Sequence, residues 1–267
     1  MLGLVHNFDE KRLPKVRESI LSLKTCLDLN HFVTVMESTK QKSKSLGLLR
    51  LVLKYLMYFN IEQRVLTSDK NAWQRLKSTI KLTKKEVRRY FNLSKRERLK
   101  LRQKHYIHYQ ITKKHVNLWK QAKKHQCDAL LVFEDDVVFN ADSNQKLELF
   151  IELLSGDKKR IFVDLAGGFS ELKHMQEEYY QDGIIRVIPP TSNTACAYFY
   201  NVNAVNDLIK IVTRKPYLKL LSIDWLMNEL FIRHLKSEII SLHTRPTVLT
   251  HGSMNKAYQS WMSKDEG

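Results

Sequence analysis

The sequence predicts an α/β fold in which a single Rossmann-like, mostly parallel sheet is flanked by helices. Short β-branched runs alternate with longer helical patterns along the chain, and no internal repeat or Ser/Gly/Pro-rich linker interrupts them. A length of 267 residues and a hydrophobic content of 43% allow a sizeable core. We therefore expect one domain over residues 1–267, with functional residues beyond the carboxyl ends of the strands.

Six segments have the composition of strands: Gly3–Phe8, His31–Met36, Asp128–Phe133, Arg160–Leu165, Ala195–Tyr200 and Ile239–Leu249. Between the first two, Lys11–Leu27 is amphipathic and is predicted to be a helix. Ser143 is predicted to cap a helix that Gly156 ends, and Asn203 a helix that ends before Pro216. This alternation is typical of a mostly parallel sheet with both faces covered.

A basic segment departs from the alternation. The chain has 45 Lys+Arg and 28 Asp+Glu, a net charge of +17, and Lys77–Lys104 contains twelve basic residues but only Glu86 and Glu97. We predict a basic helical insertion at about 70–110, which is a solvated face, a dock for an anionic surface or acceptor, or a site for RNA. Its expected inward stripe is Ile80, Val87, Tyr90, Phe91 and Leu99.

The location expected from the sequence is cytoplasmic. Three widely spaced cysteines, Cys26, Cys127 and Cys196, indicate a reducing compartment, and the first residues lack the apolar region of a signal peptide. The apolar stretch Leu46–Phe59 contains Arg50 and Lys54 and is too short to span a bilayer. Its basic residues are compatible with peripheral contact with an anionic membrane at the inner face, and also with a buried helix that has a basic edge.

The most informative motif is an apolar run that ends in three consecutive acids, Glu134, Asp135 and Asp136. Neighbouring carboxylates repel one another at a buried strand end unless a cation neutralises them. Oxygen ligands of this kind suit Mg²⁺ or Mn²⁺, which in turn bind phosphate oxygens. The alternative is an acidic turn in solvent.

Two further positions are candidates for chemistry. Asp224 lies in the first turn of a helix that Ser222 can cap, where it either offsets the helix dipole or acts as a general base. His251 follows an apolar strand and precedes a glycine, so it can reach back to a site at a strand end. The chain contains no HExxH, GxGxxG, P-loop or GxSxG motif, which argues against zinc hydrolases, Rossmann dehydrogenases, Walker NTPases and α/β-hydrolases.

The ordered set of motifs resembles glycosyltransferase family 25, which includes lipopolysaccharide and lipooligosaccharide galactosyltransferases. The resemblance rests on His115–Trp119 (HVNLW), on LLVFEDDVVF, on Thr194–Tyr198 (TACAY) and on Ile223–Trp225 (IDW), in that order. The N-terminal VHNFDEKRLPKV is similar to the opening strand of that family.

The resemblance implies a GT-A fold with a metal-binding DxD-type motif. Glu134, Asp135 and Asp136 would occupy the DxD position, with Asp136 as the direct metal ligand, Glu134 in support and His251 completing the metal shell. Asp224 would be the catalytic base. Five residues would lie near the nucleotide-sugar: Asn7, Arg12, Glu134, Asp135 and, in the loop before a strand, Thr194.

The expected activity is therefore metal-dependent glycosyl transfer with inversion. Mn²⁺ or Mg²⁺ would be the cofactor, a UDP-sugar such as UDP-galactose the donor, and a glycan or lipid-linked glycan the acceptor, as in surface polysaccharide or lipopolysaccharide biosynthesis. Two alternatives remain open at this point. The acids and the basic helices also suit a metal-dependent nuclease or phosphotransferase acting on nucleic acid, or a non-catalytic module that binds polyanions.

Overall fold

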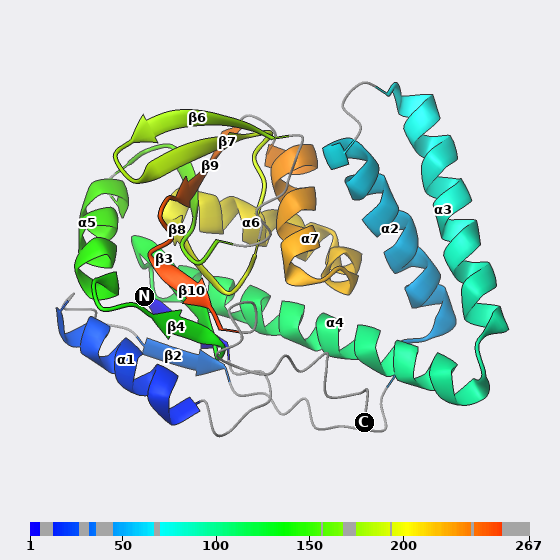
Figure 1. The fold of residues 1–267 in the computed structure, drawn as a ribbon, viewed down its shortest axis with the longest axis horizontal. Coiled ribbons are helices and arrows are strands. Elements are labelled where there is room, and N and C mark those ends of the chain that lie inside the picture. Colours follow the sequence, from blue (N-terminus) through cyan, green and yellow to red (C-terminus); the bar gives the residue numbers. More distant parts are fainter. Residues whose placement is uncertain are drawn as a thin grey trace.

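A computed structural model describes residues 1–5, 13–26, 32–35, 45–66, 70–155, 157–167, 175–192, 194–235 and 238–252 (Figure 1). The strands are β1 (Leu2–Val5), β2 (Phe32–Val35), β3 (Ala129–Glu134), β4 (Val137–Phe139), β5 (Arg160–Asp164), β6 (Gln176–Gln181), β7 (Ile184–Ile188), β8 (Ala197–Asn201), β9 (Ile239–Thr244) and β10 (Leu249–His251). The helices are α1 (Leu13–Cys26), α2 (Leu48–Leu66), α3 (Ala72–Asn92), α4 (Lys95–Lys124), α5 (Ser143–Ser155), α6 (Val202–Arg214), η1 (Pro216–Leu220), α7 (Ile223–Glu229) and η2 (Leu230–Leu235).

The α/β class is confirmed, but the main sheet is mixed. Its order is β2-β1-β3-β8-β5-β9-β7-β6, and β4 pairs with β10 in a separate two-stranded sheet. Six of the eight strands run in one direction, whereas β7 and β8 run in the other, which makes four of the seven pairings antiparallel. The sheet is mixed because β6 and β7 form a hairpin and no described helix separates β7 from β8, so neither connection is a helical crossover.

Helices cover both faces of the main sheet, as expected (Figure 1). Leu131 and Phe133 of β3 pack in a cluster with residues of α1 and α5, and the alternate residues Leu130 and Val132 pack in a cluster with α4, α6 and α7. This alternation follows from the two-residue period of a strand. The core is therefore two apolar layers, one on each side of the sheet.

Helix α4 joins the basic segment to this core. Its second half is buried against the sheet, and Gly3 of β1 allows close approach because a Cβ there would lie 2.8 Å from Leu118. The first half extends away from the sheet beside α2 and α3 (Figure 1). The predicted insertion at about 70–110 is thus helical, as α3 and the start of α4, but α4 continues directly into the core.

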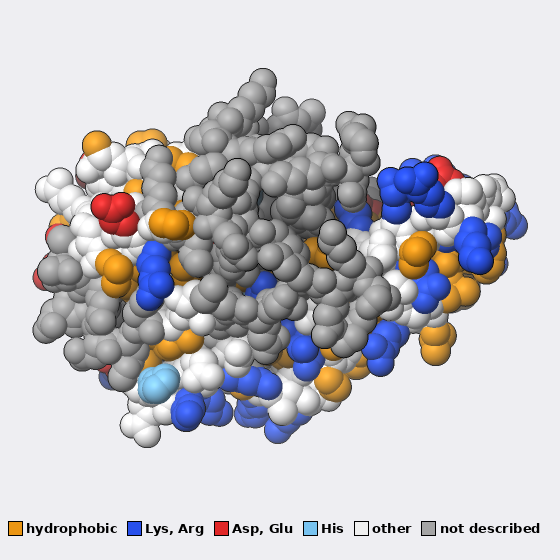
Figure 2. Space-filling view, turned by 90° about the horizontal axis from the view of Figure 1, so that it is seen from below, with side chains coloured by type: hydrophobic (Ala, Val, Ile, Leu, Met, Phe, Trp, Pro, Cys, Tyr) orange, Lys and Arg blue, Asp and Glu red, His pale blue; other side chains and the backbone are white. Residues whose placement is uncertain are grey.

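The expected inward stripe of the basic helices was largely wrong. Tyr90 is buried, but Ile80, Phe91 and Leu99 are exposed. The helices project from the sheet and have few neighbours to cover a second apolar face, so these side chains share the surface with many Lys and Arg side chains (Figure 2). Among the described helices, none combines the length and apolar content needed to cross a bilayer.

Several boundaries differ from the sequence prediction. The predicted strand Ile239–Leu249 is shorter in the structure: β9 ends at Thr244, and Leu249 is the first residue of a separate strand, β10. Strands β4, β6 and β7 were not predicted. Helix α6 is capped by Asn201, whose side chain accepts a hydrogen bond from the N–H of Ala204, and not by Asn203. Ser143 is the first residue of α5, and its hydroxyl donates to the carbonyl of Val248. Gly156 lies outside the described residues.

Candidate functional site

Those predicted site residues that the structure describes converge on one edge of the main sheet. Strands β3 and β5 end there, with Glu134 and Asp164 as their last residues. Strand β8 runs in the opposite direction between them, so the residues that precede it, including Cys196, lie at the same edge. The N–H of Glu134 donates to the carbonyl of Cys196 at 2.7 Å. Because β8 runs opposite to β3 and β5, the segments that contain Glu134, Asp164 and Cys196 meet at this edge.

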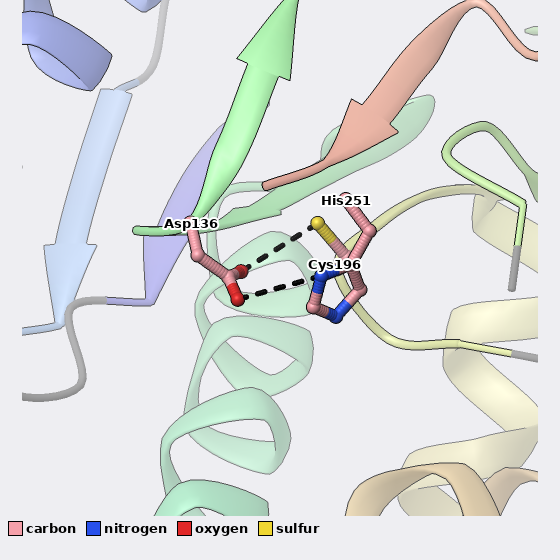
Figure 3. Close-up of side chains that lie close together, drawn as sticks. All are labelled: Asp136, Cys196 and His251. Atoms are coloured by element: carbon pink, nitrogen blue, oxygen red, sulfur yellow. Dashed lines mark hydrogen bonds and ion pairs between the residues drawn. The ribbon is translucent and has the colours of Figure 1, made fainter. Parts of the chain in front are cut away.

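Asp136, Cys196 and His251 form a compact cluster just beyond this edge (Figure 3). Their potential ligand atoms lie within 4.8 Å of one another. Asp136 Oδ1 accepts from the Cys196 thiol at 3.6 Å, and Asp136 Oδ2 lies 3.6 Å from His251 Nδ1. Pairing of β10 with β4 places His251 opposite Val137, and the N–H of Gly252 donates to the carbonyl of Asp136. The expected proximity of Asp136 and His251 is confirmed.

The donor set of this cluster fits a divalent cation. His251 Nδ1 is buried and, among the described residues, has no hydrogen-bond partner, which is the state expected of a nitrogen reserved for a ligand. A carboxylate and an imidazole suit Mn²⁺, with remaining positions open to phosphate oxygens and water. Burial, followed by the nearby Asp136, raises the pKa of Cys196 well above its usual value, so this residue is a neutral thiol beside the carboxylate.

Glu134 is held by a buried hydrogen-bond chain that the site prediction did not include. His115 Nε2 lies 2.9 Å from Glu134 Oε1, His115 Nδ1 lies 2.8 Å from the Tyr198 hydroxyl, and Trp119 Nε1 donates to that hydroxyl. A neutral imidazole facing a carboxylate carries its proton on Nε2, so Nδ1 accepts from Tyr198. Burial lowers the pKa of His115 to about 3, which is consistent with the neutral ring. The chain fixes where Glu134 points.

Asp164 organises the loop that leads into β8. Its Oδ1 accepts the N–H groups of Ala166 and Gly167, and its Oδ2 accepts the N–H of Thr194 at 3.2 Å. Thr194 Oγ1 in turn accepts the N–H of Cys196. Thr194 is thus positioned at the sheet edge by a carboxylate on the neighbouring strand.

Asp224 reaches the same edge from the first turn of α7. Its carboxylate accepts a hydrogen bond from the N–H of Ala195, while Oδ1 is buried and, within the described part of the chain, has no hydrogen-bond partner. Burial raises the pKa of Asp224 to about 6, and the nearby Asp164 contributes to the increase. Ser222 occupies the N-cap position, as predicted, but its side chain makes no capping hydrogen bond.

The structure thus brings Glu134, Asp136, Thr194, Asp224 and His251 around the start of β8. Asp135 is buried in the turn after β3, which contradicts the alternative of an acidic turn in solvent. Asn7 and Arg12 lie outside the described residues.

Asp164, Cys196 and His115 were not among the predicted site residues. Asp164 had a usable signal, because it ends an apolar strand just as Glu134 does. Cys196 and His115 had none beyond the resemblance, because their roles depend on contacts between segments far apart in sequence.

Comparison with known proteins adds no identification. The chain matches no protein-family model, and no curated protein matches its sequence significantly.

Proposed function

We propose that this protein is a metal-dependent inverting glycosyltransferase of the GT-A type that uses a nucleotide-sugar donor. The observation that carries the proposal is the juxtaposition at one sheet edge of an Asp136–His251 pair suited to a cation and a separate, half-buried Asp224, whose buried Oδ1 has no hydrogen-bond partner among the described residues. The Asp136–His251 pair would hold the cation that binds the diphosphate of the donor, and Asp224 would act on the attacking hydroxyl of the acceptor.

The sheet topology supports a nucleotide site beside Asp136. The chain passes from β1 to β2 on one side and later to β3 on the other side of β1, with all three strands parallel. Ligands of open α/β sheets bind at such a switch point, outside the carboxyl ends of the strands. The acids after β3 lie at that crevice, and the segment with Asn7 and Arg12 follows β1 in the sequence.

Asp136 and His251 would hold Mn²⁺ or Mg²⁺, with Glu134 kept in orientation by His115. A divalent cation bound there supplies positive charge to the diphosphate leaving group. Neighbouring N–H groups around Thr194 are already ordered by Asp164, so this loop can contact the sugar without rearranging.

Asp224 would accept the proton of the acceptor hydroxyl as that oxygen attacks the anomeric carbon and the bond to the diphosphate breaks. A carboxylate with a pKa of about 6 is ionised at neutral pH and is a stronger base than an ordinary aspartate. Attack from the face opposite the leaving group inverts the anomeric configuration, as it does when inverting glycosidases activate water.

The exposed basic surface supports an acceptor carried on an anionic membrane. Lys and Arg side chains gather over the projecting end of the molecule formed by α3 and α4 (Figure 2). Apolar side chains at both ends of α3, Trp73 and Phe91, are also exposed. This combination favours peripheral contact with anionic lipid, where a lipid-linked glycan acceptor resides, and a role in lipopolysaccharide or other surface polysaccharide synthesis.

The test is calorimetric titration of UDP into the full chain with and without Mn²⁺. We expect binding that requires Mn²⁺ and that weakens by at least about 10²-fold in Asp136→Ala, since even outer-shell changes at metal sites cost 10–100-fold. Asp182→Ala, which removes an exposed acid on the β6–β7 hairpin, is the matched control. UDP binding that is indifferent to both Mn²⁺ and Asp136 would contradict the proposal.

A further inference from the structure

A second polar region lies outside the sheet edge, in a cavity of about 410 Å³ where α2, α3, α4 and the start of α7 meet. Its lining includes Lys54 and Tyr58 of α2, His105 and His108 of α4, and Trp225 of α7. The site described above uses none of these side chains. A cavity of this size can hold a small polar ligand such as one sugar residue.

Lys54 is the least expected of these residues. It is 6% exposed, and its only hydrogen bond in the described part of the chain joins Nζ to His105 Nδ1 at 2.9 Å. An ammonium can only donate, so His105 Nδ1 accepts, and the ring proton lies on Nε2, which donates to the Tyr55 hydroxyl at 3.3 Å. No carboxylate of the described residues forms an ion pair with Lys54. Two of its three N–H donors remain for a ligand.

The acids that line the cavity have their own partners. Glu62 accepts a hydrogen bond from the Tyr58 hydroxyl at 3.0 Å, and Glu86 lies 3.8 Å from Arg89. Glu62 is two helical turns from Lys54 along α2, which is about 12 Å at 1.5 Å per residue. The cavity therefore has one end, at Lys54, where none of the described carboxylates serves as a counter-ion to the buried amine.

Aromatic rings form the wall near α7. Tyr58 and Trp225 pack edge to face with their centroids 4.6 Å apart, and both line the cavity. Flat apolar surfaces beside hydrogen-bonding groups suit the apolar face of a sugar ring. Trp225 and Ser222, which also lines the cavity, flank Asp224 in the first turn of α7.

We propose that this cavity is the acceptor subsite and that it selects a sugar bearing a carboxylate or a phosphate. The anionic group would bind the free N–H donors of Lys54, and the ring would lie against Trp225 and Tyr58. The glycan would then extend past the start of α7 toward Asp224. This assignment rests on the proposed transferase function, because it names the acceptor for that reaction.

The electrostatic environment of Lys54, His105 and His108 in the cavity agrees with this assignment. Burial, followed by the charge of Lys104, lowers the pKa of Lys54 to about 7. Burial and the Lys54 charge lower the pKa of His105 to about 2 and that of His108 to about 3, so both rings are neutral. The other charged side chains around these three residues are Glu86 and Arg89 of α3, Glu62 of α2 and Lys104 of α4. A bound anion would restore the Lys54 charge, so binding above about pH 7 takes up a proton.

The test is titration of the full chain at pH 8, without UDP or metal, using glucuronate, glucose 6-phosphate, neutral glucose and inorganic phosphate. We expect the two anionic sugars, or one of them, to bind at least about tenfold more tightly than glucose, because the anionic group would accept charge-assisted hydrogen bonds from Lys54. Comparing glucuronate with glucose 6-phosphate identifies which anion is preferred. The measured heat of binding should differ between buffers of different ionisation enthalpy, because Lys54 takes up a proton from the buffer when the anion binds.

Lys54→Met should abolish this preference, whereas Lys84→Met, which removes an exposed cation of α3, should retain it. Trp225→Leu should weaken all sugars but not inorganic phosphate. Equal binding of glucose and the anionic sugars would overturn the proposal, as would equal losses in the two lysine variants or inorganic phosphate binding as tightly as the sugar phosphate. Since neither nucleotide nor metal is present, these results are independent of whether UDP binds at Asp136.

Discussion

The sheet edge and the helical cavity both bury charged side chains, but with opposite sign. At the edge, the buried carboxylate of Asp136 lies beside the neutral thiol of Cys196 and the imidazole of His251, so this region presents oxygen and nitrogen atoms that suit a cation. In the cavity, Lys54 faces the neutral imidazole of His105, so the uncompensated charge is positive. A buried charge is costly unless it is paired. Our two proposals follow this difference: they assign a cation to the first region and an anion to the second, with Asp224 at the boundary.

The largest expected effect concerns Asp224. Asp224→Asn keeps the shape but removes the base, so UDP release from UDP-galactose should slow by about 10²–10⁴-fold. UDP binding in the presence of Mn²⁺ should be nearly unchanged, because in the proposed reaction Asp224 would serve the acceptor side. In the wild type, kcat/KM should fall about tenfold per pH unit below about pH 6, where Asp224 becomes protonated.

Asp182→Asn, an exposed position on the β6–β7 hairpin, is the control and should leave the rate unchanged. Full activity of Asp224→Asn would show that Asp224 is not the catalytic base. A parallel loss of UDP binding would instead assign Asp224 to the donor side and break the division between the two regions.

A smaller effect is expected at His115, which positions Glu134. His115→Leu removes both hydrogen bonds of the ring and should weaken Mn²⁺-dependent UDP binding by about tenfold, as outer-shell changes do. His115→Gln can donate to Glu134 and accept from Tyr198, so it should restore most of the affinity. Thermal melting of both variants separates this positioning role from a loss of folding. Equal affinities of His115→Leu and wild type would show that Glu134 does not support the metal.

The smallest effect concerns the stability of the cavity. The folded-state pKa of Lys54 is about 7, against 10.5 as its ordinary value, so the unfolded chain binds more protons between these values and stability rises with pH there. The free energy of unfolding of the wild type, relative to Lys54→Met, should rise by about 1 kcal/mol from pH 7 to pH 8. Urea unfolding of both proteins at the two pH values measures this double difference. A constant difference would mean that Lys54 keeps an ordinary pKa and that the cavity is wetter than its burial indicates.

Local pattern was sufficient for most of the elements that carry the site. The apolar run before Glu134 and the terminal position of Asp136 predicted a strand followed by buried acids. The apolar residues before His251 predicted a strand next to it, although His251 is itself the last residue of β10 and does not follow the strand. These predictions succeed because side-chain periodicity and the burial of apolar runs are properties of neighbouring residues.

The sequence by itself determined the α/β class, the strand that ends in acids, the first-turn position of Asp224 and the basic helices. Only the tertiary structure decided that β8 runs backwards between β3 and β5, which brings Cys196 and Thr194 to the acids. Only packing of α4 against α2 placed His105 beside Lys54, 51 positions away in the chain. Strand direction and helix contacts depend on interactions between distant segments, and a pattern of neighbouring residues does not contain them.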